Sequence, residues 1–170
     1  MEKNIILIGF MGVGKGSTAR AFAKKHNVYN IDTDDLIESK EKKEVKKIFS
    51  KKGESYFRAC EQETANWIEA SVEGTLISCG GGFYKVDNLK KLGTIVLLDA
   101  SFEWIHNRLK TAKNSKEKLE KRPLFSDEKK AKRLYEKRAK EYKSLADVVV
   151  DVEGLSFDEQ IDFIAKKCKV

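Results

Sequence analysis

Short apolar runs alternate with longer amphipathic stretches along the chain. Apolar, β-branched runs bounded by glycine or polar residues are typical of buried strands, whereas apolar positions every three to four residues predict helices. The predicted strands are residues 5–8, 28–31, 75–78, 94–98 and 146–152. The predicted helices are residues 17–25, 36–52, 54–71, 102–109, 131–142 and 157–167, with a break at Gly53. This alternation predicts an α/β fold, with a parallel sheet covered by helices on both faces, in one domain over residues 1–170.

Three candidate motifs directly follow predicted strands. Residues 9–15 follow the first strand, residues 32–35 the second, and residues 80–82 the third. In open parallel sheets, ligands bind beyond the carboxyl ends of the strands. We therefore expect a binding site at that edge.

Residues 9–15, Gly-Phe-Met-Gly-Val-Gly-Lys, match the first seven positions of the phosphate-loop pattern G-x-x-x-x-G-K-[ST]. The glycines allow backbone N–H groups to surround phosphate oxygens, and the N-terminus of the following helix adds donors and a positive dipole. Lys15 is the residue that reaches the β- and γ-phosphates. The alternative is a glycine-rich turn without a ligand, but the position between a buried strand and a helix favours a phosphate loop.

The loop departs from the pattern at one position. Gly16 stands where a Ser or Thr hydroxyl would ligate Mg²⁺. Ser17 follows, but successive helical side chains point about 100° apart, so Ser17 cannot replace that hydroxyl without a shift of the backbone.

The acceptor side of the predicted site contains carboxylates and arginines. Asp32 to Asp35 can hold Mg²⁺ through water or accept a proton from an attacking hydroxyl, and the alternative role is a helix N-cap. On a helix, Glu54 and Glu61 would lie beside Arg58 and orient its guanidinium towards a substrate carboxylate. An ordinary surface ion-pair trio remains the alternative.

Two further motifs are open to more than one interpretation. Gly80 to Gly82 would let a ligand approach bare backbone and its N–H donors, or they form a flexible turn. Arg122, at the end of a polar segment, would cover the phosphates as part of a lid. Arg138, one turn before Tyr142, offers a second guanidinium group for paired hydrogen bonds to a carboxylate. Basic residues on a solvated helical face are the alternative for both.

The net charge of +7 is concentrated in residues 110–143, which hold 14 Lys and Arg against 6 Asp and Glu. Such a block indicates either an anionic partner or a solvated helical face. A nucleic-acid platform needs stacking aromatics, and Phe125 is the only aromatic residue from Lys110 to Arg133, so we expect no nucleic acid partner. No apolar run reaches the ~20 residues of a membrane span, and no signal peptide is evident, so we expect no membrane partner. Three scattered cysteines indicate free thiols in the cytoplasm.

Taken together, the motifs resemble those of shikimate kinases, and the resemblance covers nearly the whole chain. It is carried by the Gly-Phe-Met-Gly opening of the loop, Asp32 to Asp34, residues 53–58, the triple glycine, residues 122–124, and Arg138 with Tyr142 and Ala146. The resemblance implies a five-stranded parallel sheet in order 2-3-1-4-5, with a mobile lid at about residues 110–126 and an acceptor-binding region at about 32–62. It implies ATP-dependent phosphorylation of the shikimate 3-hydroxyl, a step towards aromatic amino acids, with Mg²⁺ as cofactor.

The resemblance also implies a role for each matching residue. Asp34 would be the base and contact the acceptor, and Lys15 and Arg122 would stabilise the transferring phosphoryl group. Asp32 would hold Mg²⁺ through water, with Ser17 as a second candidate. The acceptor-binding residues would be Asp34, Arg58, Gly80, Gly81, Gly82 and Arg138. The ATP-binding residues would be Gly12, Val13, Gly14, Lys15, Gly16, Ser17, Arg108 and Arg122.

This sequence departs from the family pattern at Gly16, Ala19 and Cys79. The segment from Arg108 to Arg122 is also long for the family. Gly16-Ser17 is similar to the loop of adenylate kinases. The alternatives are therefore a nucleoside-monophosphate kinase or another small-metabolite kinase on the same fold, a nucleic-acid-binding P-loop protein, or a non-catalytic binding module. We expect a monomer that binds ATP and shikimate.

Overall fold

The computed structural model describes residues 3–111 and 127–170. Its strands are β1 (Ile5–Ile8), β2 (Asn30–Asp32), β3 (Leu76–Ser78), β4 (Thr94–Asp99) and β5 (Val148–Asp151). Its helices are α1 (Lys15–His26), α2 (Thr33–Glu41), α3 (Val45–Ser71), η1 (Phe83–Lys85), α4 (Leu89–Leu92), α5 (Phe102–Thr111), α7 (Glu128–Leu145) and α8 (Phe157–Cys168).

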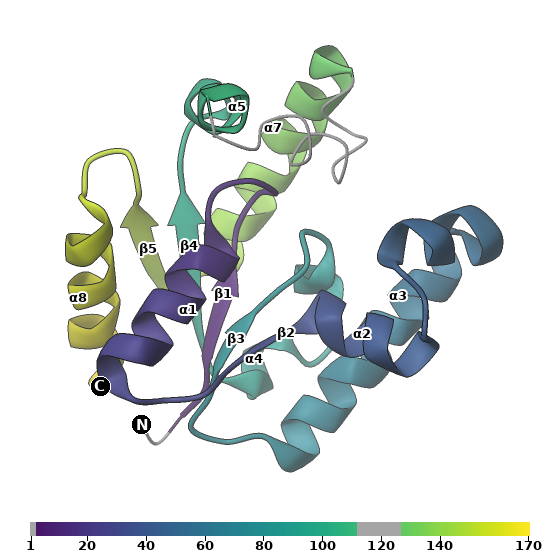
Figure 1. Cartoon of the computed structure of the whole chain (residues 1–170), viewed down its shortest axis with the longest axis horizontal. Coiled ribbons are helices and arrows are strands. Elements are labelled where there is room, and N and C mark those ends of the chain that lie inside the picture. Colours follow the sequence, from purple (N-terminus) through teal and green to yellow (C-terminus); the bar gives the residue numbers. More distant parts are fainter. Residues whose placement is uncertain (1–2, 112–126) are drawn as a thin grey trace.

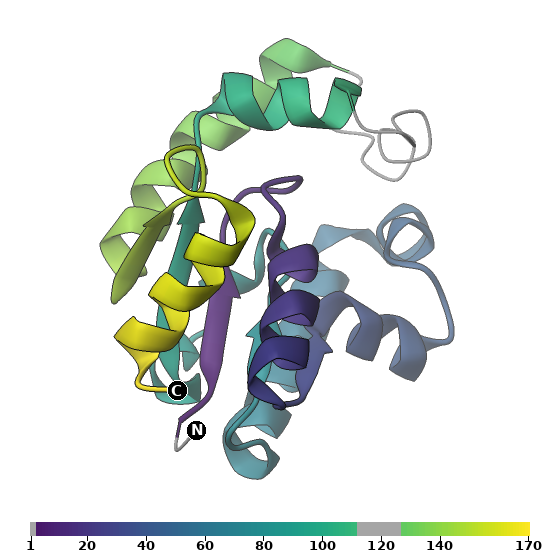
Figure 2. The ribbon, with the colours of Figure 1, turned by 60° about the vertical axis from the view of Figure 1, so that its left-hand side comes forward.

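The five strands form one parallel sheet in the order β2-β3-β1-β4-β5, which confirms the predicted topology. Helices α1 and α8 lie on one face of the sheet, and α7 lies on the other (Figures 1 and 2). In register, Asp32 pairs with Ser78, so the carboxyl ends of β2 and β3 meet at the same level. The three motifs that follow β1, β2 and β3 are thereby brought to one edge, as expected from the sequence.

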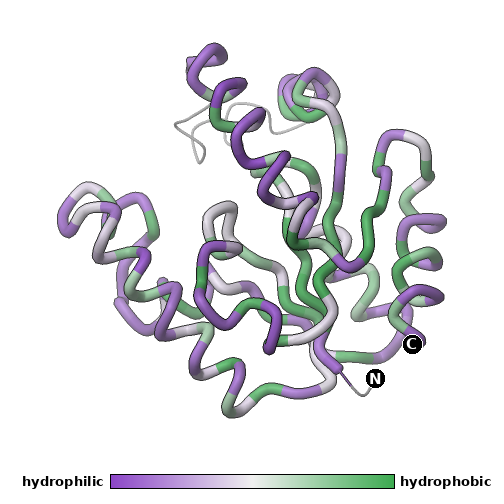
Figure 3. Tube along the Cα trace, turned by 180° about the vertical axis from the view of Figure 1, so that it is seen from behind, coloured by the Kyte–Doolittle hydropathy of each residue, from purple (hydrophilic) through white to green (hydrophobic). Residues whose placement is uncertain are grey.

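The core lies between the sheet and these helices. Figure 3 shows hydrophobic residues along the strands and mostly hydrophilic residues along α7. A second, smaller cluster joins α2 to α3 and is centred on Ile37, Ile48, Phe57 and Cys60. No helix of the described residues is long and apolar enough to cross a membrane. All three cysteines are free thiols, as predicted.

The prediction of one helix over residues 36–52 was wrong. Helix α2 ends at Glu41 because Lys42 adopts a left-handed conformation (φ 51°), and the Glu38 carboxylate accepts a hydrogen bond from the Val45 N–H (2.7 Å) where α3 begins. The break at Gly53 is confirmed, since its φ of 82° is non-helical and kinks α3. Strand β2 starts two residues later than predicted, and α1 starts at Lys15 rather than Ser17.

Asn4, which the sequence did not single out, fastens three segments at the opposite edge of the sheet. Its buried side chain donates hydrogen bonds to the carbonyl oxygens of Val72 (2.7 Å) and Leu92 (2.9 Å). Its amide oxygen accepts one from the N–H of Thr75 (3.0 Å). One side chain therefore satisfies backbone groups on the segments that lead into β3 and β4.

We expect Asn4→Ala to lower the free energy of unfolding by about 2–4 kcal/mol, because it leaves two buried backbone groups and one partly buried group without partners. Urea denaturation measures this change. Asn107→Ala, at an exposed position in α5, is the matched control and should change stability by less than about 0.5 kcal/mol. Equal effects of the two substitutions would contradict the role given to Asn4.

Candidate active site

The phosphate loop joins β1 to α1. Gly9, Gly12 and Gly14 have positive φ angles of 146°, 87° and 119°, which side-chain-bearing residues rarely adopt. Lys15 is the first residue of α1, and its ammonium group donates hydrogen bonds to the carbonyl oxygens of Gly9 (2.8 Å) and Phe10 (3.3 Å). The lysine thus lies over the loop at the positive end of a helix, where phosphate oxygens are favoured.

Helix α5 packs directly on this loop. A Cβ atom on Gly12 would collide with Leu109, and one on Gly14 would collide with Arg108. The Arg108 guanidinium donates to the carbonyl oxygen of Val13 (2.6 Å) and lies 5.3 Å from the ring centroid of Trp104. Trp104 was not predicted, although its position four residues before Arg108 places both on one helical face.

Asp32 and Thr33 are both engaged in backbone contacts where β2 ends. Asp32 is the N-cap of α2, and its carboxylate accepts a hydrogen bond from the N–H of Asp34 (2.9 Å). The N-cap interpretation is therefore confirmed for Asp32, and its second carboxylate oxygen leaves room for another role. The Thr33 hydroxyl accepts a hydrogen bond from the N–H of Gly80 (2.9 Å), which joins this motif to the triple glycine.

Each of the three consecutive glycines faces a different predicted acceptor residue. A Cβ atom on Gly80 would overlap the Asp34 carboxylate, and one on Gly82 would overlap the Arg58 guanidinium. A Cβ atom on Gly81 would lie 3.0 Å from an Arg138 guanidinium nitrogen.

None of the three glycines has a positive φ, so close approach rather than backbone conformation requires them. The expectation that they offer N–H donors to a ligand fails at Gly80, because that N–H is bonded to Thr33.

Arg58 is held from both sides, as its spacing predicted. Glu54 accepts hydrogen bonds from its Nε (3.2 Å) and Nη2 (2.9 Å), and Glu61 accepts one from its Nη1 (2.5 Å). The Glu61 carboxylate is almost fully buried, and its other oxygen has no partner among the described residues. A buried carboxylate in such a pair fixes the guanidinium much more firmly than an exposed one.

The Asp34 carboxyl group is poised to exchange a proton near neutral pH. Burial raises its pKa to about 7, with further contributions from the negative charges of Asp32 and Glu61, while Lys15 acts in the opposite direction. Its Oδ1 atom is buried and has no hydrogen-bond partner among the described residues. A carboxyl group in this state is well matched to accept a proton from a hydroxyl.

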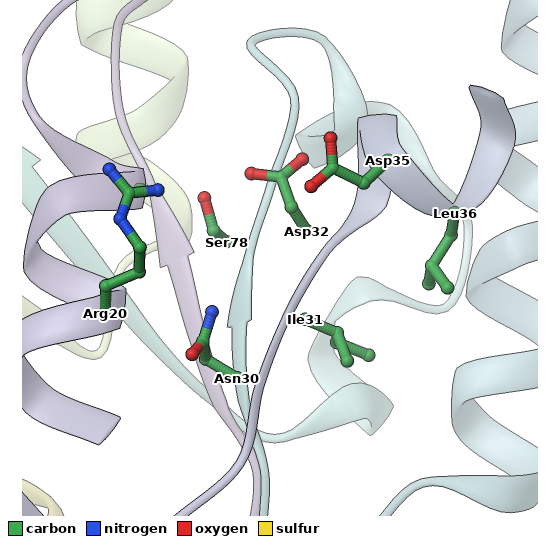
Figure 4. Close-up of a pocket in the computed structure, with 8 residues that line it drawn as sticks. Arg20, Asn30, Ile31, Asp32, Asp35, Leu36 and Ser78 are labelled. Atoms are coloured by element: carbon green, nitrogen blue, oxygen red, sulfur yellow. The ribbon is translucent and has the colours of Figure 1, made fainter. Parts of the chain in front are cut away.

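A cavity of about 330 Å³ opens beside the start of α1. Figure 4 shows the carboxylates of Asp32 and Asp35 near each other, with the Ser78 hydroxyl between Asp32 and the Arg20 guanidinium. Gly16 lines this cavity, whereas Ser17 does not and is exposed. Among residues 3–111 and 127–170, no group of three His, Cys, Asp or Glu could hold a metal directly. Carboxylate and hydroxyl oxygens around an open space suit a hydrated Mg²⁺ ion held through water.

Comparisons with known proteins agree with this geometry. The family model described as shikimate kinase matches residues 11–169. The chain is 39% identical over 156 residues to the shikimate kinase of Helicobacter hepaticus, covering 92% of this chain and 90% of the relative. The chain belongs to the shikimate kinase family.

Solved structures of shikimate kinases have the same fold. The enzyme from Bacteroides thetaiotaomicron superimposes with a TM-score of 0.84 at 26% identity, over the whole of both chains. The shikimate kinase from Acinetobacter baumannii, solved in complex with shikimate, gives a TM-score of 0.85 at 25% identity, covering 98% of this chain and 93% of that one. Family membership therefore holds despite the departure at Gly16. The predicted lid at 110–126, with Arg122, lies almost wholly outside the described residues.

The raised pKa of Asp34 predicts a pH-dependent stability for this member of the shikimate kinase family. The usual pKa in an unfolded chain is about 3.9. Between that value and about 7, the folded state binds the extra proton, so the stability associated with protonated Asp34 is lost as the pH rises through about 7. Asp34→Asn cannot ionise, and we expect its stability advantage over the parent to grow by about 2–3 kcal/mol between pH 5 and pH 8.

Denaturation of the ligand-free proteins at both pH values measures this difference. Asp87→Asn, at an exposed position outside the site, is the matched control. A pH-independent difference for Asp34→Asn would show that Asp34 is ionised throughout this range.

Proposed function

We propose that the chain transfers the γ-phosphoryl group of ATP to the 3-hydroxyl of shikimate, giving shikimate 3-phosphate and ADP. Membership of the shikimate kinase family supports the reaction and its place in aromatic amino acid biosynthesis. The single observation that carries the site assignment is the triple glycine, because it brings one carboxyl group and two guanidinium groups to one short stretch of bare backbone.

The phosphate loop binds the phosphates of ATP. Its backbone, the N-terminus of α1 and Lys15 together supply positive potential where charge accumulates on the transferring group. Arg108 lies on the loop next to Trp104, where the adenine would pack. Arg122 is proposed to grip the phosphates from the lid. Exclusion of water by such a lid strengthens each of these interactions.

Asp34 is the proposed base. As the new bond forms between the acceptor oxygen and the γ-phosphorus, the bond from that phosphorus to the leaving ADP oxygen breaks. The proton of the acceptor hydroxyl passes to the Asp34 carboxylate. A pKa of about 7 keeps a large fraction of this group ionised at neutral pH while leaving it basic enough to accept the proton.

Arg58 and Arg138 are proposed to bind the carboxylate of the acceptor. Their guanidinium groups lie against adjacent glycines, and planar guanidinium groups match a carboxylate through paired hydrogen bonds. The buried Glu61 holds Arg58 in place.

We also propose that the enzyme is a monomer in the cytoplasm. The three free thiols are consistent with a reducing compartment.

Mg²⁺ is the implied cofactor. When bound, it neutralises charge on the β- and γ-phosphates. Asp32, with Asp35 and Ser78 beside it, would hold the ion through water, because Gly16 offers no hydroxyl. The exposed Ser17 stays a less suitable candidate.

The acceptor is tested by ADP release measured with shikimate, AMP and gluconate in turn. We expect turnover with shikimate alone. Arg58→Lys should raise KM for shikimate about tenfold or more with little change in KM for ATP, because lysine cannot reproduce the fork. Arg133→Lys, exposed on α7, is the matched control and should change neither constant. Turnover with AMP, or a change mainly in KM for ATP, would refute the acceptor assignment.

Gly16→Ser tests how Mg²⁺ is held. A Cβ atom at Gly16 meets only an Arg20 nitrogen at 3.4 Å, so the cavity accepts the new side chain. Glycine is costly in a helix, and the variant should melt at a slightly higher temperature. It should also need less Mg²⁺ for ADP binding measured by calorimetry, because it restores a direct oxygen ligand. An equal or higher Mg²⁺ requirement would favour Ser17 as the ligand.

A further inference from the structure

Arg58 and Arg138 both lie against the glycine loop, which is the segment Gly80 to Gly82, but they are held differently. Arg58 forms ion pairs with Glu54 and Glu61. Arg138 is buried, forms no ion pair among the described residues, and its Nε has no hydrogen-bond partner there. A long, flexible side chain without carboxylate partners needs another source of orientation.

Tyr142, one turn after Arg138 on α7, supplies the first contact. Its hydroxyl donates a hydrogen bond to the carbonyl oxygen of Gly81 (2.6 Å), the glycine that Arg138 faces. Tyr142 also interacts with the Arg138 side chain, and burial raises the pKa of Tyr142 to about 12, so its hydroxyl remains a donor. This contact holds α7 close to the glycine loop at the position of Arg138.

Tyr84 supplies two more contacts from the loop side. It lies in η1, two residues after the triple glycine, and is buried. Its ring packs edge-on against Tyr142, with centroids 4.8 Å apart and planes at 72°. Its hydroxyl donates a hydrogen bond to the carboxylate of Glu141, the residue before Tyr142.

These contacts connect the glycine loop and η1 to the last turns of α7. We propose that Tyr84 and Glu141 are positioning residues that hold Arg138 over Gly81, through Tyr142, for binding of the acceptor carboxylate. The proposal rests on the acceptor role given to Arg138 above. The two residues would act by fixing the position of Arg138. A displacement of about 1 Å lengthens and misaligns paired hydrogen bonds to a carboxylate, and the acceptor then binds less tightly. Arg58 needs no such support, since its own helix carries its carboxylates.

Tyr84→Phe tests the proposal because it removes only the hydroxyl and keeps the buried ring. We expect KM for shikimate to rise about three- to tenfold, while KM for ATP and kcat change by less than about twofold. Calorimetric titration with shikimate alone should show the same loss of affinity. Glu141→Gln keeps the shape and one acceptor oxygen, so its effect on KM for shikimate should be smaller and not additive with Tyr84→Phe.

Tyr135→Phe is the matched control. Tyr135 also lies on α7, and its hydroxyl donates to the carbonyl oxygen of Ala100 (2.8 Å), away from the glycine loop. Loss of the Tyr135 hydroxyl should lower the free energy of unfolding about as much as loss of the Tyr84 hydroxyl, without raising KM for shikimate. A rise equal to that of Tyr84→Phe would mean that any loosening of α7 is sufficient, and would overturn the specific role of Tyr84.

The decisive measurement repeats Tyr84→Phe in an Arg138→Lys background. If Tyr84 acts through Arg138, adding Tyr84→Phe to the Arg138→Lys variant should change its already raised KM for shikimate very little. Full additivity, or an unchanged KM for Tyr84→Phe alone when Arg138→Lys raises it, would overturn the positioning role. If Arg138→Lys itself leaves KM for shikimate unchanged, the acceptor role of Arg138 fails, and the positioning proposal fails with it.

Discussion

The candidate site depends on the close approach of three charged side chains to a backbone that carries no Cβ atoms. Asp34, Arg58 and Arg138 come from α2, α3 and α7, and each lies against one of three consecutive glycines. Any other residue at these positions would push the facing group away. The glycine loop is fixed in turn by Thr33 and Tyr142, which bond to its first N–H and its second carbonyl. Side chains from three helices thereby lie against one short segment of backbone.

The close packing of these charged side chains also determines the pKa of Asp34. Glu61 stabilises the Arg58 guanidinium by a short ion pair, and its negative charge also raises the pKa of Asp34. Lys15 opposes that rise from the side of the phosphates. The environment of the Asp34 carboxyl group thus disfavours ionisation, while two guanidinium groups lie against the adjacent glycines. This arrangement fits the proposed binding of an anionic acceptor next to a base.

The sequence predicted the parts of this arrangement that depend on local spacing or strand order. The sheet order followed from the resemblance, and the residues around Arg58 followed from helical periodicity. It could not predict contacts that tertiary packing alone creates, such as Tyr84 with Glu141 or the fastening role of Asn4. The break between α2 and α3 was missed because Lys42 is an unusual residue for a left-handed cap.

The two arginines of the acceptor side are supported separately from Gly16, the atypical position of the phosphate loop. Gly16 borders the cavity beside β2, and the atom nearest to its missing side chain belongs to Arg20, in its own helix. Arg58 and Arg138 are held by the glycine loop, α3 and α7, and none of the contacts described for them involves Gly16. Asp34 links the two sides, because its N–H bonds to Asp32 and the charge of Asp32 raises its pKa. We therefore expect a substitution at Gly16 to leave the two arginines in place, whereas a substitution at Asp32 would also affect Asp34.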